Sequence, residues 1–180
     1  MAEIKSTLEL ALEKTKKIGI SDEERQEIKQ KEVLQKVSSL SHRYREGLSS
    51  LHEILKEIEK MDEKIRSWVV ENLLNQWIET LSLDDEGERL FKGIESLKHR
   101  DTEEMKQKFY DLLTLYQEEK EEIKKRVRIQ LVEILRKEHI YGSAVEPKLE
   151  ESELYKKESE DLDRIYRMKL EELKEKLKTL

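Results

Sequence analysis

The chain lacks cysteine altogether and has only one proline and five glycines among its 180 residues. The absence of cysteine excludes disulfides, thiolate metal ligands and a cysteine nucleophile, and it is compatible with a reducing compartment. Five scattered glycines cannot form a glycine-rich phosphate loop or a dinucleotide-binding fingerprint. Aromatic residues are also scarce, at 6%, and hydrophobic residues reach only 36%. We therefore expect an elongated, narrow-cored molecule rather than a thick spherical one.

Long apolar runs are missing as well. The longest stretch without a charged residue spans residues 72–78, far short of the roughly 20 apolar residues needed to cross a bilayer. Residues 1–6 do not provide the basic start and apolar stretch of a secretory signal. We expect a cytoplasmic protein with no transmembrane segment.

Charge is abundant instead: 43% of the residues are charged, and 36 Lys and Arg against 42 Asp and Glu give a net charge of -6. A composition rich in Glu, Lys, Leu and Arg is typical of long helices. The acidic balance disfavours nonspecific attraction to phosphate and favours protein partners. Since no alternating strand pattern or hairpin turn is present, we predict an all-α fold.

A seven-residue apolar repeat runs from Val33 to Trp68 and predicts a coiled-coil seam. Among its inner positions only Gly47 interrupts the repeat. At about 1.5 Å of rise per residue, the run corresponds to roughly 50 Å of helix. We expect the seam to be the interaction surface of the protein, formed by Val33, Val37, Leu40, Tyr44, Leu51, Ile54, Ile58, Met61, Ile65 and Trp68.

The sparse helix stops divide the chain into segments. A short amphipathic helix is expected over about 2–18, because Gly19 follows its last apolar residue as a C-terminal cap would. Ser21 and Glu24 form a capping-box pattern that opens a long second helix. We expect this helix to continue over about 21–81, with Gly47 marking the place for a kink or break.

The second half begins with a turn over residues 82–87 and a short helix that ends near residues 98–100. A second long helix is expected over about 101–140, with Met105, Tyr116 and Val127 at eleven-residue spacing. An eleven-residue repeat favours bundle packing over one continuous two-stranded coil. Residues 142–147 contain the single proline and read as a linker. The segment 148–180 is an amphipathic helix that either packs back or projects toward another chain.

Together these signals predict an elongated antiparallel helical bundle or coiled coil. Its two long helices cover about 21–81 and 101–140, with shorter helices at both termini. In this interpretation residues 1–141 form the bundle with its seam, residues 142–147 the linker, and residues 148–180 a terminal amphipathic helix.

Side chains that could support chemistry do not form a recognisable constellation. None of the four histidines follows a glutamate by three residues, as di-iron helices require, and Glu95 with His99 is better explained as a solvated pair. Serines beside His42 and His52 lack an oriented base and oxyanion donors. We expect no catalytic, cofactor-binding or metal-binding residues, no cofactor, and no enzymatic activity.

Two basic clusters, residues 42–45 and 124–128, are the only sequence features that favour nucleic acid. Tyr44 in the first occupies a seam position, and successive residues of the second point about 100° apart around a helix. Nucleic acid is therefore not the expected partner. The sequence predicts a non-enzymatic scaffold, stalk or adaptor that binds a second copy of itself or another helical protein. The alternative is a helical factor associated with RNA or the ribosome.

Overall fold

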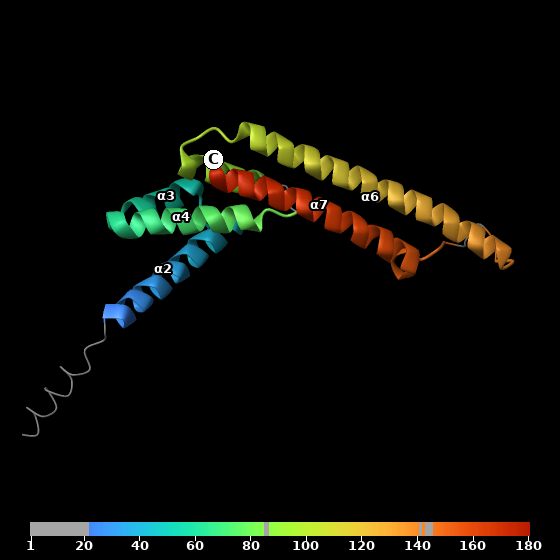
Figure 1. Cartoon of the computed structure of the whole chain (residues 1–180), viewed down its shortest axis with the longest axis horizontal. Helices are drawn as coiled ribbons and strands as arrows, with labels where there is room; N and C mark the ends of the chain where they lie inside the picture. The colour runs from blue at the N-terminus through green and yellow to red at the C-terminus, as the bar shows by residue number, and fades with distance from the viewer. Residues whose placement is uncertain (1–21, 85–86, 141, 143–145) are drawn as a thin grey trace, which may run out of the picture. The chain divides into compact units, whose positions relative to one another are not determined.

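A computed structural model describes residues 22–84, 87–140, 142 and 146–180, and all regular structure in these ranges is helical (Figure 1). The all-α prediction is confirmed. By its internal contacts the chain divides into two compact units, Met1–Leu73 and Leu74–Leu180. The short helix expected over 2–18 lies outside the described residues. No helix in the described part of the chain is both long and apolar enough to cross a membrane.

The single helix expected over 21–81 is wrong, because the structure has three helices in that range: α2 (Asp22–Arg45), α3 (Leu51–Glu59) and α4 (Glu63–Thr80). The first break is built around Gly47, whose φ of 72° is left-handed and therefore suits a residue without Cβ. The Leu48 amide donates to the Arg43 carbonyl at 2.8 Å, closing the end of α2. The sequence marked this break but did not decide between continuity and interruption.

A new helix starts immediately after the break because Ser50 caps it. The Ser50 side chain accepts from the Glu53 amide while the Glu53 carboxylate accepts from the Ser50 amide, so both halves of a capping box are present. The Arg43 guanidinium also donates to Glu57, which joins α2 to α3 within the first unit.

A second break, over residues 60–62, was not predicted, since the heptad runs through it without interruption. The Arg66 guanidinium crosses the break and donates to the carbonyls of Glu59 and Met61 at 2.6 and 3.0 Å. The Arg66 amide in turn donates to Asp62 at 2.8 Å in the first turn of α4. The apolar repeat therefore specifies which face of the chain is buried, whereas local hydrogen bonds decide where each helix ends.

The second unit contains the end of α4, α5 (Glu88–Lys98), α6 (Glu103–Lys137), the 3-10 turn η1 (Leu149–Glu151) and α7 (Glu153–Thr179). The long helix predicted over 101–140 is confirmed as α6. The C-terminal helix packs back on α6 (Figure 1), which decides between docking and projection. Pro147 lies in the non-helical stretch before η1, and the linker residues 143–145 lie outside the described residues. The expected linker thus separates two helices of one compact unit.

The core of the second unit is most aromatic where α5 meets the start of α6. The rings of Phe91 and Phe109 lie 5.3 Å apart, and both side chains are fully buried. Gly87, at the N-terminus of α5, has a φ of 64°. A Cβ at this position would lie 2.9 Å from the Phe109 ring, closer than carbon atoms pack.

We expect Gly87→Ala to destabilise the protein by about 1–3 kcal/mol, because a left-handed non-glycine residue costs about 1 kcal/mol and the added carbon collides with Phe109. Denaturant unfolding followed by circular dichroism measures the effect. Glu88→Ala is the control, since it removes only an exposed ion pair with Lys92 and should stay within about 0.5 kcal/mol of the parent protein. Equal stabilities of the two variants would contradict the proposed collision.

Candidate functional site

The ten residues of the predicted seam are buried or half-buried in the fold. Leu51, Met61, Ile65 and Trp68 are half-buried. The other six are buried: Val33, Val37, Leu40, Tyr44, Ile54 and Ile58. Large exposed apolar side chains lie elsewhere, and several are on the hairpin formed by α6 and α7. That hairpin is the candidate functional site.

Two tyrosines fix how α6 and α7 meet. The rings of Tyr116 on α6 and Tyr166 on α7 lie 5.4 Å apart. The Tyr116 hydroxyl donates to Asp163 across the interface, and the Tyr166 hydroxyl donates to Glu119 in the opposite direction, both at 2.7 Å. Each buried hydroxyl therefore has a charged acceptor on the other helix, and the exchange defines one antiparallel register.

Lysines and carboxylates shape the electrostatics of this tyrosine pair. The Lys120 ammonium donates to the Tyr116 hydroxyl at 3.2 Å, and the Lys169 ammonium lies 4.2 Å from the centre of the Tyr166 ring. Burial, the hydrogen bond to Glu119 and the negative charges of Glu119 and Glu118 raise the pKa of Tyr166 to about 12. The pKa of Tyr116 is raised too, chiefly by burial and by its bond to Asp163. Both hydroxyls remain protonated donors at neutral pH.

One side of the hairpin forms a polar cleft of about 450 Å³ with the segment that follows α4. Lys174 is the most buried charge there, 6% exposed, and it donates to the Glu79 carbonyl at 3.0 Å and to Glu171 at 2.8 Å. The cleft is lined by Glu79, Thr80, Leu81, Ser82, Leu83, Asp84, Tyr116, Lys120, Asp163, Arg167, Leu170, Glu171 and Lys174.

The polar groups of this cleft bind mainly to one another. Lys174 is neutralised by its partners, Asp163 accepts from Tyr116, and Thr80 donates to the carbonyl of Gln76. Arg167 has no ion-pair partner among the described residues, but its side chain is exposed. The arrangement joins α4, α6 and α7 and contains no nucleophile held against a base.

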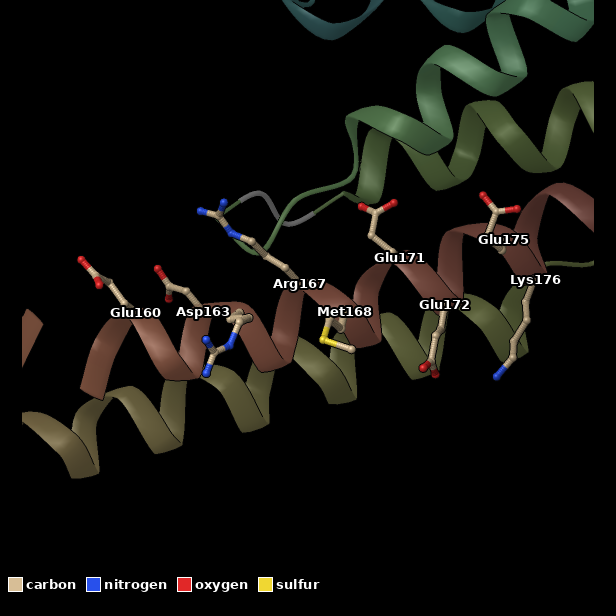
Figure 2. A pocket seen from close by; sticks show the side chains of 9 residues that line it. Glu160, Asp163, Arg167, Met168, Glu171, Glu172, Glu175 and Lys176 are labelled. Carbon is tan, nitrogen blue, oxygen red and sulfur yellow. The ribbon is translucent and has the colours of Figure 1, made fainter. Parts of the chain in front are cut away.

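The opposite side of the hairpin has a different character. Figure 2 shows Met168 and Glu172 on one side of α7 and Arg167 and Glu171 on the other. An open hollow of about 980 Å³ runs along α7 alone and shares Asp163, Arg167 and Glu171 with the cleft. Leu115 and Ile165 directly precede the two facing tyrosines, which places them on the same side of an antiparallel pair of helices. The helical period puts the other exposed apolar residues nearest to that side, and the set is Leu115 and Ile129 of α6 and Leu154, Ile165 and Met168 of α7.

The basic clusters are engaged by carboxylates of the chain itself. In the first, Tyr44 is buried and Arg43 pairs with Glu57. In the second, Val127 is buried and three of the cations have partners. These pairs join Lys124 to Glu121, Arg126 to Glu158 and Arg128 to Glu146.

The described residues contain no group of three histidine, cysteine or carboxylate side chains placed to hold a metal ion. His99, considered with Glu95 in the sequence, ends α5 instead: its φ is 51°, and its amide donates to the Glu95 carbonyl at 3.0 Å. Comparison with protein-family models, curated proteins and solved structures found no match to this chain.

We expect Tyr166→Phe to lower the free energy of unfolding at neutral pH by about 1–2 kcal/mol, because a hydrogen bond from a buried hydroxyl to a carboxylate is lost. Chemical denaturation of the two proteins measures the difference. Tyr155→Phe is the matched control, since Tyr155 on the same helix is half-buried and has no hydrogen bond among the described residues. A loss as large in the control would contradict the role given to the hydroxyl.

The raised pKa of Tyr166 also predicts a dependence on alkaline pH. The ordinary pKa of tyrosine is 10.0, so above pH 10 the unfolded chain releases the Tyr166 proton, whereas the folded chain keeps this proton until about pH 12. Stability should therefore fall as pH rises through this window. In Tyr166→Phe the slope of unfolding free energy against pH should be shallower between about pH 10 and 12. An unchanged slope would show that other groups dominate.

Proposed function

We propose that this protein is a non-enzymatic scaffold or adaptor of the cytoplasm that acts through protein–protein contacts along its helices. The observation that carries the proposal is the α6–α7 hairpin, a pair of helices with large apolar side chains exposed on one side. Scattered apolar residues are normal on any protein surface. Here five of the exposed apolar residues gather on one side of a single hairpin, which is the arrangement of an interaction surface.

Burial of the seam changes which surface is favoured for the contact. Ile54 and Ile58 are 0% and 3% exposed, so they pack within the chain itself. A dimer held by the seam would need these side chains released from their present packing. The hairpin needs no such rearrangement, and this favours another protein as the partner over a second copy joined along residues 33–68.

The ion pairs of the second basic cluster weigh against nucleic acid. A phosphate backbone would have to displace Glu121, Glu158 and Glu146 from cations that they already neutralise. Binding to phosphate draws its affinity from free cations and from counterion release. Contact with the surface of a helical protein requires neither free cations nor counterion release, so protein contact is the better supported function.

The test compares complexes isolated from native cells, with and without nuclease, at about 0.1 M and about 0.5 M salt. We expect partner proteins to remain bound under all four conditions, because apolar contacts respond weakly to salt, whereas phosphate contacts lose about 10³-fold or more in affinity. Mass spectrometry of the retained proteins is the measurement. Complexes that disappear with nuclease or high salt would support the RNA- or ribosome-associated alternative.

A further inference from the structure

The last two turns of α6 extend beyond the helix that packs against it. Figure 1 shows α6 continuing past the N-terminal end of α7. Because Tyr116 faces Tyr166 and the helices run antiparallel, residue 129 of α6 lies level with Glu153, the first residue of α7. Residues 130–137 therefore form an overhang of about 12 Å. The short turn η1 contacts α6 and, by the same register, lies level with residues 131–133.

The overhang continues the apolar stripe of α6 without burying it. The stripe is buried as far as Val127, and the next positions at helical spacing are Leu131 and Ile134. Ile134 is 50% exposed. The other large aliphatic residues of the overhang are half-buried, namely Leu131, Val132 and Leu135. The core stripe of the hairpin thus runs past the end of its own cover, and a further helix could bury the remainder.

Charges of both signs surround this apolar end of the hairpin. Glu133 and Lys137 are four residues apart and so lie on the same side of α6. Both are exposed, and neither has an ion-pair partner among the described residues. The exposed charges without an ion pair in the described parts of residues 130–153 are Glu133, Arg136, Lys137, Glu138 and Glu150. A partner with charge of a single sign would therefore meet repulsion as well as attraction here.

The order of these charges along α6 is complementary to itself. If a second overhang lies antiparallel across a two-fold axis level with Leu135, residues equally far before and after Leu135 lie level with each other. Glu133 precedes Leu135 by two residues and Lys137 follows it by two, so each copy places its Glu133 beside Lys137 of the other. The two-fold axis keeps these residues on one side of the pair. The neighbouring charges lie level with aliphatic residues, Arg136 with Ile134 and Glu138 with Val132.

We propose that the overhang is a self-association site, at which the same residues of a second copy of this chain pack antiparallel around a two-fold axis level with Leu135. Ile134 and Leu135 of each copy would be covered by the other copy, and Glu133 would pair with Lys137 in both directions. This reciprocal pairing is the observation that selects a second copy. The inference goes beyond the proposed function and does not depend on it, since a scaffold with one or two copies could bind the same partner.

Analytical ultracentrifugation of the full chain measures the association directly. The experiment covers about 1 µM to about 500 µM protein at about 0.15 M salt. We expect the weight-average mass to rise with concentration from the 21.6 kDa of one chain toward twice that mass. A dissociation constant of about 10–100 µM is expected, because an overlap of two helical turns is smaller than the interfaces of tight dimers.

Charge reversal tests the two-fold arrangement. Glu133→Lys alone or Lys137→Glu alone would oppose like charges twice and should weaken self-association by about tenfold or more. An equimolar mixture of these two single variants should associate again, because each copy then offers the charge that the other lacks. The double variant with both changes should also associate like the parent chain. Glu118→Lys is the matched control, since Glu118 is an exposed glutamate of α6 far from the overhang.

Loss of the apolar contact tests the other half of the proposal. Ile134→Gln combined with Leu135→Gln should weaken self-association by about tenfold or more. Leu48→Gln, at a residue 69% exposed in the first unit, makes the same kind of change elsewhere and should leave the dissociation constant unchanged. Circular dichroism of every variant checks that the helices are retained.

A mass that stays at that of one chain over the whole concentration range would overturn the self-association site. A dimer that the overhang variants leave intact would place the contact elsewhere and would overturn it too. Failure of both the mixture and the double variant to associate would reject the two-fold pairing. The nuclease and salt experiment tests the proposed function separately, so partner proteins retained there by a chain that stays monomeric would reject only this site.

Discussion

The antiparallel register of α6 and α7 is the constraint on which the second unit depends. Shifting one helix by a single residue would turn its apolar stripe by about 100° and separate both tyrosine hydroxyls from their carboxylates. Buried polar groups penalise such errors more sharply than apolar contacts do, because an unpaired hydroxyl inside the fold costs about 1–3 kcal/mol. The same register sets which residues border the cleft and which lie on the other side of the hairpin. The two sides of the hairpin are thus consequences of one exchange of hydrogen bonds.

Most of the helical content was predictable, because apolar periodicity and cap residues are local signals. Gly47, with Ser50 and Glu53, carried enough information to mark the first break. The break over residues 60–62 was missed because the heptad continues through it and because the stabilising donor, Arg66, belongs to the next helix. Periodicity reports burial and says little about whether the backbone stays continuous.

The candidate site was less predictable than the fold. The eleven-residue spacing placed Tyr116 inside, yet nothing near Tyr116 in the sequence identifies Asp163 or Tyr166 as its partners. Pairing between helices 47 residues apart depends on a register that no single segment specifies. For the predicted seam, the periodicity identified an apolar stripe but could not say what covers it, and Ile54 and Ile58 are buried within the chain itself.

The hydrogen bond from Lys174 to the carbonyl of Glu79 spans 95 residues of sequence, whereas the pair that joins α2 to α3 spans 14. Contacts between residues close in sequence form quickly, whereas contacts between residues far apart in sequence form only after a long loop has closed. During synthesis the first unit can acquire its contacts while α7 is still within the ribosome. The apolar stripe of α6 stays exposed to water until α7 has left the ribosome and packs against it. During that interval chaperones or other nascent chains can bind the exposed stripe.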